Sequence, residues 1–191
     1  FVTGAPAEAD LQAFLDSHYI IDIRAEDDFD ESDGDGGHIE GAVNVAFADI
    51  LSAADAADKQ ILVVCYTGQT ACYATALLRL AGHRDAQALK WGMSGWNSNF
   101  SAPWDGHEGT DQAASAGSSW NTTAVTSLTF SDPELSETIT DGASLLDSRI
   151  ATVVSDGFKG VDASAVLANP GNYFVNNYFS EAHYNGFGHV N

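Results

Sequence analysis

Apolar residues in the first hundred positions alternate between short continuous runs and helical spacing. Short, mostly apolar runs typical of buried strands occur at residues 19–23, 43–47, 61–64 and 86–89, and the run at 61–64 is mostly β-branched. Apolar residues recur at three- and four-residue intervals over residues 7–17, 48–57 and 71–81, which predicts helices there. Gly82 follows the last of these, where glycine commonly ends a helix. Strands alternating with helices predict an α/β fold with a mostly parallel sheet and helices on both faces.

The pattern weakens in the second half of the chain. Gly, Ser, Ala, Thr and Asn dominate between about residues 99 and 131, which is typical of a connector. Residues 134–156 contain apolar positions with partly helical spacing. The sequence therefore predicts a first domain at 1–104, a connector at 105–133 and a C-terminal part at 134–191.

Cys65 stands between the predicted strand at 61–64 and the predicted helix at 71–81. A thiol in that position faces unpaired backbone N–H groups and the positive end of the helix dipole. We expect the N–H groups of residues 66–71 to converge on the sulfur, with added hydrogen bonds from the Thr67 and Thr70 side chains. These donors should lower the thiol pKa. Negative charges elsewhere on the surface oppose this effect only weakly, because they are screened beyond about 10 Å. The alternative is a cysteine that is simply buried in the core.

Four segments carry a family resemblance, in order and in approximate spacing. They are Tyr19–Arg24, Gly37–Asn44, Cys65–Ala71 and Trp91–Trp96. Together they resemble the rhodanese family of sulfurtransferases over about residues 8–100, half of the chain. The resemblance implies a rhodanese-like fold in which Cys65 is the catalytic nucleophile and carries a persulfide. The loop implied to bind that persulfide consists of Tyr66, Thr67, Gly68, Gln69, Thr70 and Ala71.

Three polar residues of these segments form an expected structural signature. Asp22 and Arg24 lie at the end of the first predicted strand, and we expect Arg24 to pair with a carboxylate of the acidic loop that follows. His38, in the Gly-His-Ile segment, is expected to stabilise a turn rather than to act as a base. Cys72 is expected to be a core residue of the helix, with a resolving thiol as the alternative.

The loop composition separates two chemistries that use such a cysteine. Cysteine phosphatases need a Cys-x5-Arg loop, because arginine binds the phosphate dianion through two hydrogen bonds. Ala71 stands where that arginine belongs, whereas backbone amides alone can hold a persulfide anion. By the resemblance, the six residues from Cys65 to Thr70 also match the loop length of the sulfurtransferases. The sequence therefore predicts an enzyme that moves a sulfane sulfur through Cys65 to a thiophilic acceptor; the alternative is a non-catalytic rhodanese-like binding or regulatory module.

Charge narrows the list of partners. The 191 residues include 27 acidic and 7 basic side chains, for a formal net charge of −20. Such a surface repels phosphate backbones, so nucleic-acid binding is not expected. The chain contains no run of 18 or more apolar residues, the length needed to span a membrane. The neutral loop and anionic surface disfavour thiosulfate and favour a polysulfide or protein-bound persulfide donor. The expected partners are thus a small-molecule or protein-bound sulfur donor and a thiol acceptor.

No metal or cofactor is expected. In the acidic loop at 26–37, the frame with Gly36 at position 6 of an EF-hand places Ala42 where the calcium-binding glutamate belongs. The histidines show no zinc-binding spacing, and the chain has no glycine motif for phosphate binding. A first residue other than methionine indicates a processed or trimmed chain, and the composition is compatible with an exported protein.

The end of the chain resembles the start of the first domain. Residues 164–177 are similar to 10–23, and Gly188–Asn191 is similar to Gly37–Glu40. This similarity predicts that 134–191 opens a second, incomplete rhodanese-like repeat, which a further chain or segment would complete. Asn176 and Tyr178 replace the aspartate and arginine, and no third cysteine exists, so this repeat should be inactive. The alternative is chance similarity over a short stretch.

Overall fold

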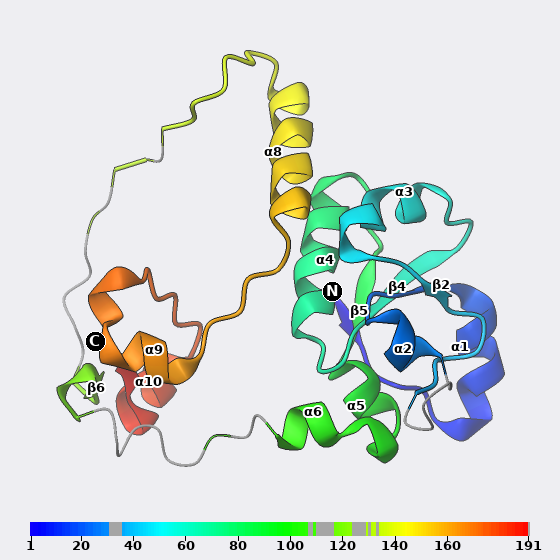
Figure 1. The fold of residues 1–191 in the computed structure, drawn as a ribbon, viewed down its shortest axis with the longest axis horizontal. Helices are drawn as coiled ribbons and strands as arrows, with labels where there is room; N and C mark the ends of the chain where they lie inside the picture. The colour runs from blue at the N-terminus through cyan, green and yellow to red at the C-terminus, as the bar shows by residue number, and fades with distance from the viewer. Residues whose placement is uncertain are drawn as a thin grey trace. The chain divides into compact units, whose positions relative to one another are not determined.

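The computed structural model describes residues 1–30, 36–106, 109, 117–123, 129, 131–132 and 134–190 (Figure 1). The chain divides into two compact units. The first comprises Phe1–His107 and Glu137–Phe158, and the second comprises Glu108–Ser136 and Lys159–Asn191. Within the described ranges, no helix is both long enough and apolar enough to cross a membrane.

A parallel five-stranded sheet forms the centre of the first unit. Its strands are β1 (Val2–Thr3), β2 (His18–Asp22), β3 (Val43–Asn44), β4 (Gln60–Val64) and β5 (Gln87–Leu89), arranged in the order β1-β5-β4-β2-β3. The register places Ile21 of β2 beside Val63 of β4, so the two longest strands pair along their full lengths. The predicted α/β fold with a parallel sheet is confirmed. The edge strand β1 was not predicted, because two residues carry no measurable alternation.

Helices cover both faces of this sheet. Their bounds are α1 Leu11–Ser17, α2 Glu26–Phe29, α3 Ile50–Asp55, α4 Gln69–Leu80, α5 Gly92–Trp96, α6 Ala102–Asp105 and α8 Gly142–Asp156. Short 3-10 turns occur at Glu8–Asp10, Phe47–Asp49 and Ser98–Phe100. Alternate residues of β4 enter different cores: Val63 packs in the core that contains residues of α3, α4 and α8, whereas Leu62 packs in the core that contains Met93 and is lined by Phe14 of α1. This division explains the uninterrupted apolar run of β4, since both of its faces are buried.

Three short helices differ from the sequence prediction. The acidic segment after Arg24, predicted as a loop, begins with the single turn α2, whose N–H groups at Phe29 and Asp30 donate to the carbonyls of Ala25 and Glu26. Residues 31–35 of that loop lie outside the described residues. The short helices α5 and α6 follow β5, in a stretch for which the sequence predicts no helix.

Helix α8 belongs to the same compact unit as the sheet, although it lies outside the predicted first domain. It lies along α4, as Figure 1 shows, and buries Ile150 and Val154 in the core around Val63. Phe158, just beyond its end, places its ring edge-on to Tyr73 of α4, with 5.6 Å between the ring centroids. Residues 142–158 therefore add to the cover of one sheet face.

The second unit is small. It contains α9 (Ala163–Ala168), α10 (Glu181–Phe187), 3-10 turns at Gly117–Ser119 and Pro170–Asn172, and an antiparallel pair of β6 (Trp120–Asn121) with β7 (His189–Val190). Residues 173–176, compared above with the first strand, form neither helix nor strand. The incomplete second repeat thus stays a prediction, and most of the predicted connector lies outside the described residues.

Candidate active site

The loop after β4 surrounds the sulfur of Cys65 with backbone donors. The Gly68 N–H donates to Sγ over 3.1 Å, and the Ala71 N–H donates over 3.3 Å. The predicted convergence of loop amides is therefore present for these two groups. Within the described chain, the hydroxyls of Thr67 and Thr70 make no hydrogen bond to the sulfur, contrary to expectation. Their backbone N–H groups contribute instead, because they lower the pKa of the Cys65 thiol.

Two glycines allow this loop to form. Gly68 precedes α4 with a φ of +90°, a left-handed conformation that glycine adopts without strain. Gly92 starts α5 with a φ of +56°, and a Cβ there would lie 2.2 Å from the carbonyl oxygen of Cys65. The close approach lets the Met93 N–H donate to that oxygen over 2.8 Å and the Ser94 N–H donate to the Tyr66 oxygen over 3.0 Å. Helix α5 thereby holds the two residues at the start of the loop.

Burial dominates the ionisation of Cys65. The residue is 3% exposed, and this burial raises the pKa of its thiol, although the N–H groups of Ala71 and Gly68 lower it. The expectation of a lowered pKa is wrong, because loss of solvent costs the thiolate more than these hydrogen bonds return. Burial also raises the pKa of the Cys72 thiol, and the nearby Cys65 adds to that rise. Cys72 is partly buried against the same core, as expected for a helix residue.

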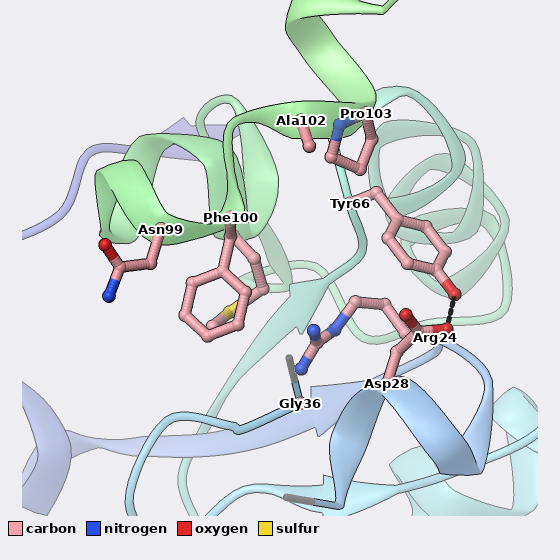
Figure 2. Close-up of a pocket in the computed structure, with 9 residues that line it drawn as sticks. Arg24, Asp28, Gly36, Tyr66, Asn99, Phe100, Ala102 and Pro103 are labelled. Atoms are coloured by element: carbon pink, nitrogen blue, oxygen red, sulfur yellow. Dashed lines mark hydrogen bonds between the residues drawn. The ribbon is translucent and has the colours of Figure 1, made fainter. Parts of the chain in front are cut away.

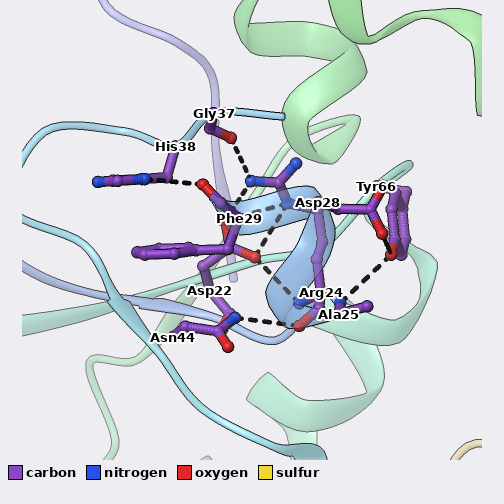
Figure 3. A network of polar contacts seen from close by, with 9 residues as sticks. All are labelled: Asp22, Arg24, Ala25, Asp28, Phe29, Gly37, His38, Asn44 and Tyr66. Atoms are coloured by element: carbon purple, nitrogen blue, oxygen red, sulfur yellow. Dashed lines mark hydrogen bonds and ion pairs between the residues drawn. The ribbon is translucent and has the colours of Figure 1, made fainter. Parts of the chain in front are cut away.

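A buried ion pair closes the end of β2 (Figure 3). Arg24 donates from Nη2 to Asp22 Oδ2 over 2.8 Å and from Nε to both carboxylate oxygens over 3.0 Å. The same Nη2 donates to the Gly37 oxygen over 2.6 Å, and Asn44 donates from Nδ2 to the carbonyl oxygens of Asp22 and Arg24. Among the described residues, Arg24 thus pairs with Asp22 and not with a carboxylate of the acidic loop. Asp22, two residues before Arg24, neutralises the guanidinium charge at a place where both side chains are buried.

Two further contacts attach α2 to its surroundings (Figure 3). Tyr66 donates its hydroxyl to Asp28 Oδ2 over 2.5 Å, and burial together with this bond raises the pKa of the phenol. His38 stacks on Phe29 with ring centroids 3.8 Å apart, and its Nδ1 lies 2.9 Å from the Phe29 oxygen. Because a carbonyl oxygen only accepts, that nitrogen carries the proton. These contacts agree with a turn-stabilising role for His38.

A cleft of about 530 Å³ lies beside the cysteine loop (Figure 2). Its lining residues are Arg24, Asp28, Gly36, Tyr66, Met93, Asn99, Phe100, Ala102 and Pro103. Cys65 is not a lining residue, but two residues next to it in the structure are. Tyr66 follows it in the chain, and the Met93 N–H donates to its carbonyl oxygen. The guanidinium of Arg24 lies 5.9 Å from the Tyr66 ring centroid and 5.6 Å from that of Phe100.

Sequence reasoning found part of this site. It identified Cys65, Tyr66 and Arg24, and the resemblance singled out the segment that contains Met93. It missed Asp28 and Phe100, because neither stands in a chemical motif. Only the packing of α2 and of the turn at Ser98–Phe100 brings them to the cleft.

The chemistry open to the site is thiol chemistry with backbone stabilisation of an anion. The remaining predicted loop residues carry no charge: Gln69 is exposed at the start of α4, and Ala71 is buried. No group of three or more His, Cys, Asp or Glu in the described part of the chain could hold a metal ion.

Comparisons with known proteins give one family match and several similar solved structures. Residues 7–99 match the model of the rhodanese-like domain. A comparison with curated proteins finds no match. Among solved structures, the chain is similar to a rhodanese-related protein from Thermoplasma volcanium, with 20% identity and a TM-score of 0.40, covering 50% of this chain and 88% of that one.

Two other solved structures are similar over a comparable part of this chain. One is a NAD-dependent persulfide reductase from A. fulgidus, with 24% identity, a TM-score of 0.36 and 50% of this chain covered. The other is the reduced CoADR-RHD of Bacillus anthracis, with 16% identity, a TM-score of 0.35 and 54% covered. The chain spans only 16% and 17% of their lengths.

Proposed function

We propose that this protein is a sulfurtransferase in which Cys65 carries the transferred sulfur as a persulfide. The observation that carries the proposal is the pair of N–H groups, from Gly68 and Ala71, that donate to Sγ at the start of α4. Such donors stabilise an anion on the cysteine, whether thiolate or persulfide. The loop has no arginine to bind a phosphate dianion, which argues against phosphatase chemistry.

The reaction has two displacement steps without net redox change. The Cys65 thiolate attacks the sulfane sulfur of the donor, the donor S–S bond breaks, and the leaving group departs with the electron pair. A thiophilic acceptor, such as cyanide or a thiolate, then attacks the outer sulfur of the Cys65 persulfide. The S–S bond of the persulfide breaks, and the Cys65 thiolate is restored.

One observation favours a second candidate, a rhodanese-like binding module without catalysis. Cys65 is 3% exposed, and burial raises the pKa of its thiol, so the protonated form prevails near neutral pH. A protonated, covered thiol attacks slowly. Sulfur transfer consequently requires the loop to admit the donor and favours a moderately alkaline pH.

Loading and turnover of Cys65 separate the two candidates. The protein is incubated with thiosulfate or with a low-molecular-mass organic persulfide, and intact mass and peptide mapping are measured by mass spectrometry. We expect one added sulfur atom on Cys65 and, after addition of cyanide, thiocyanate. Cys65→Ser should lose both signals, whereas Cys72→Ser should keep them. If no donor loads Cys65 at any pH from neutral to alkaline, or if Cys65→Ser transfers sulfur at the wild-type rate, the catalytic proposal fails.

A further inference from the structure

We propose that the sulfur donor is a small zwitterionic organic persulfide of the amino-acid type, bound in the cleft beside the cysteine loop. The inference rests on the proposed function and names the substrate class for the same site. It comes from two charged groups that face one cleft with unused hydrogen-bonding capacity.

The first group is the guanidinium of Arg24. Its Nε and Nη2 are bonded to Asp22 and to the Gly37 oxygen, but Nη1 makes no hydrogen bond within the described residues. Figure 2 shows this guanidinium reaching into the cleft near Phe100 and Gly36. Because Asp22 already balances its charge, Arg24 offers directed N–H donors rather than a strong positive field. That arrangement suits one carboxylate.

The second group is the carboxylate of Asp28. Its Oδ2 accepts the Tyr66 hydroxyl over 2.5 Å, whereas Oδ1 accepts no hydrogen bond from the described part of the chain. Among the described residues that line the cleft there is no lysine, and Arg24 is the one basic side chain. An ammonium group is the natural partner of such a carboxylate.

Tyr66 connects these two groups to the reacting cysteine. Its ring lies 5.9 Å from the guanidinium carbon, its hydroxyl is bonded to Asp28, and it is the residue after Cys65. A molecule with its carboxylate toward Arg24 and its ammonium toward Asp28 would therefore lie against Tyr66. Met93, Phe100 and Pro103 also line the cleft, and their apolar parts can contact a short alkyl chain that ends in sulfur.

The same charges disfavour an inorganic dianion. Among the described residues, Arg24, its partner Asp22 and the lining residue Asp28 together carry one negative charge, and the whole chain carries −20. Thiosulfate would meet net repulsion, whereas a zwitterion has no net charge and matches both groups. In the transfer step, the Cys65 thiolate attacks the terminal sulfur of the donor persulfide. The donor S–S bond breaks, and the donor leaves as its thiol after taking a proton from solvent.

Four donors test the charge requirement, with cyanide as the acceptor and Cys65→Ser as the baseline for uncatalysed transfer. Cysteine persulfide carries both charges, 3-mercaptopropionate persulfide only the carboxylate, cysteamine persulfide only the ammonium, and thiosulfate is the dianion. We expect kcat/KM for cysteine persulfide to exceed that for each single-charge donor by about tenfold or more. Thiosulfate should be the poorest donor.

Substitution at Asp28 tests the ammonium contact. Asp28→Asn should reduce the preference for cysteine persulfide over 3-mercaptopropionate persulfide to nearly one, chiefly through KM. Asp27→Asn, an exposed neighbour on α2, is the matched control for general loss of negative charge and should leave it unchanged.

The outcomes separate the inference from the proposed function. If thiosulfate or a single-charge donor equals cysteine persulfide, or if Asp28→Asn and Asp27→Asn have the same effect, the zwitterionic donor is refuted while sulfur transfer stands. If none of the four donors loads Cys65, the proposed function itself fails. Folding of each variant is checked by circular dichroism, and Asp28→Glu should restore part of the preference if Asp28→Asn disturbs the loop.

Discussion

Replacing Gly92 by alanine should break the contact that holds the cysteine loop against α5. Gly92 has a φ of +56°, and an added Cβ would lie 2.2 Å from the Cys65 oxygen, 2.8 Å from the Gly68 nitrogen and 2.8 Å from the Tyr66 carbonyl carbon. All three are backbone atoms of the loop, so no side chain can turn away to make room. The loop and the start of α5 must separate.

The expected cost follows from these contacts. A left-handed alanine costs about 1–2 kcal/mol. Separation of the loop loses two hydrogen bonds, from Met93 to Cys65 and from Ser94 to Tyr66, worth about 1 kcal/mol each. Displacing packed atoms adds about 1–3 kcal/mol. The sum is about 4–7 kcal/mol, a large part of the roughly 5–15 kcal/mol that stabilises a domain.

Urea denaturation followed by far-UV circular dichroism measures this cost. Gly41→Ala is the matched control, because Gly41 has a φ of +80° and an added Cβ there meets nothing within 4 Å. The control should lose only the conformational part, about 1–2 kcal/mol. The loosened loop should also speed alkylation of Cys65 in Gly92→Ala. Equal destabilisation by the two substitutions would refute the account of the loop.

The remaining predictions concern the thiol and the added helix. Because burial raises the pKa of the Cys65 thiol, its rate of reaction with iodoacetamide in a Cys72→Ser background should rise at higher pH than in the same protein unfolded in urea; an inflection at equal or lower pH would contradict the dominance of burial. Ile150→Ala on α8 should destabilise the sheet-containing unit by about 2–4 kcal/mol, because Ile150 is 3% exposed within its core. Leu146→Ala, at a 40% exposed position of the same helix, is the control, and equal urea midpoints for the two variants would show that α8 adds nothing to that core.

The sheet and its cysteine loop could be predicted because their signals are local. The apolar run at 61–64 is buried on both faces, and the helical spacing after Thr70 reflects one buried face of α4. Local pattern also indicated that Cys65 lies where the amides of the loop can reach its sulfur. Asp28 had no such signal, since it looks like one acidic residue among many in its loop.

Residue type and spacing along the chain determined the α/β fold, the position of Cys65 and the absence of a phosphate-binding arginine at position 71. These properties follow from short-range periodicity and from the identity of single residues. Only the tertiary structure decided the partner of Arg24, the docking of α8 on α4 and the direction in which the pKa of the Cys65 thiol shifts. The physical reason is that burial and long-range contacts depend on what the rest of the chain places around a group. For Cys65, the lost solvent outweighs the amides that the sequence predicts.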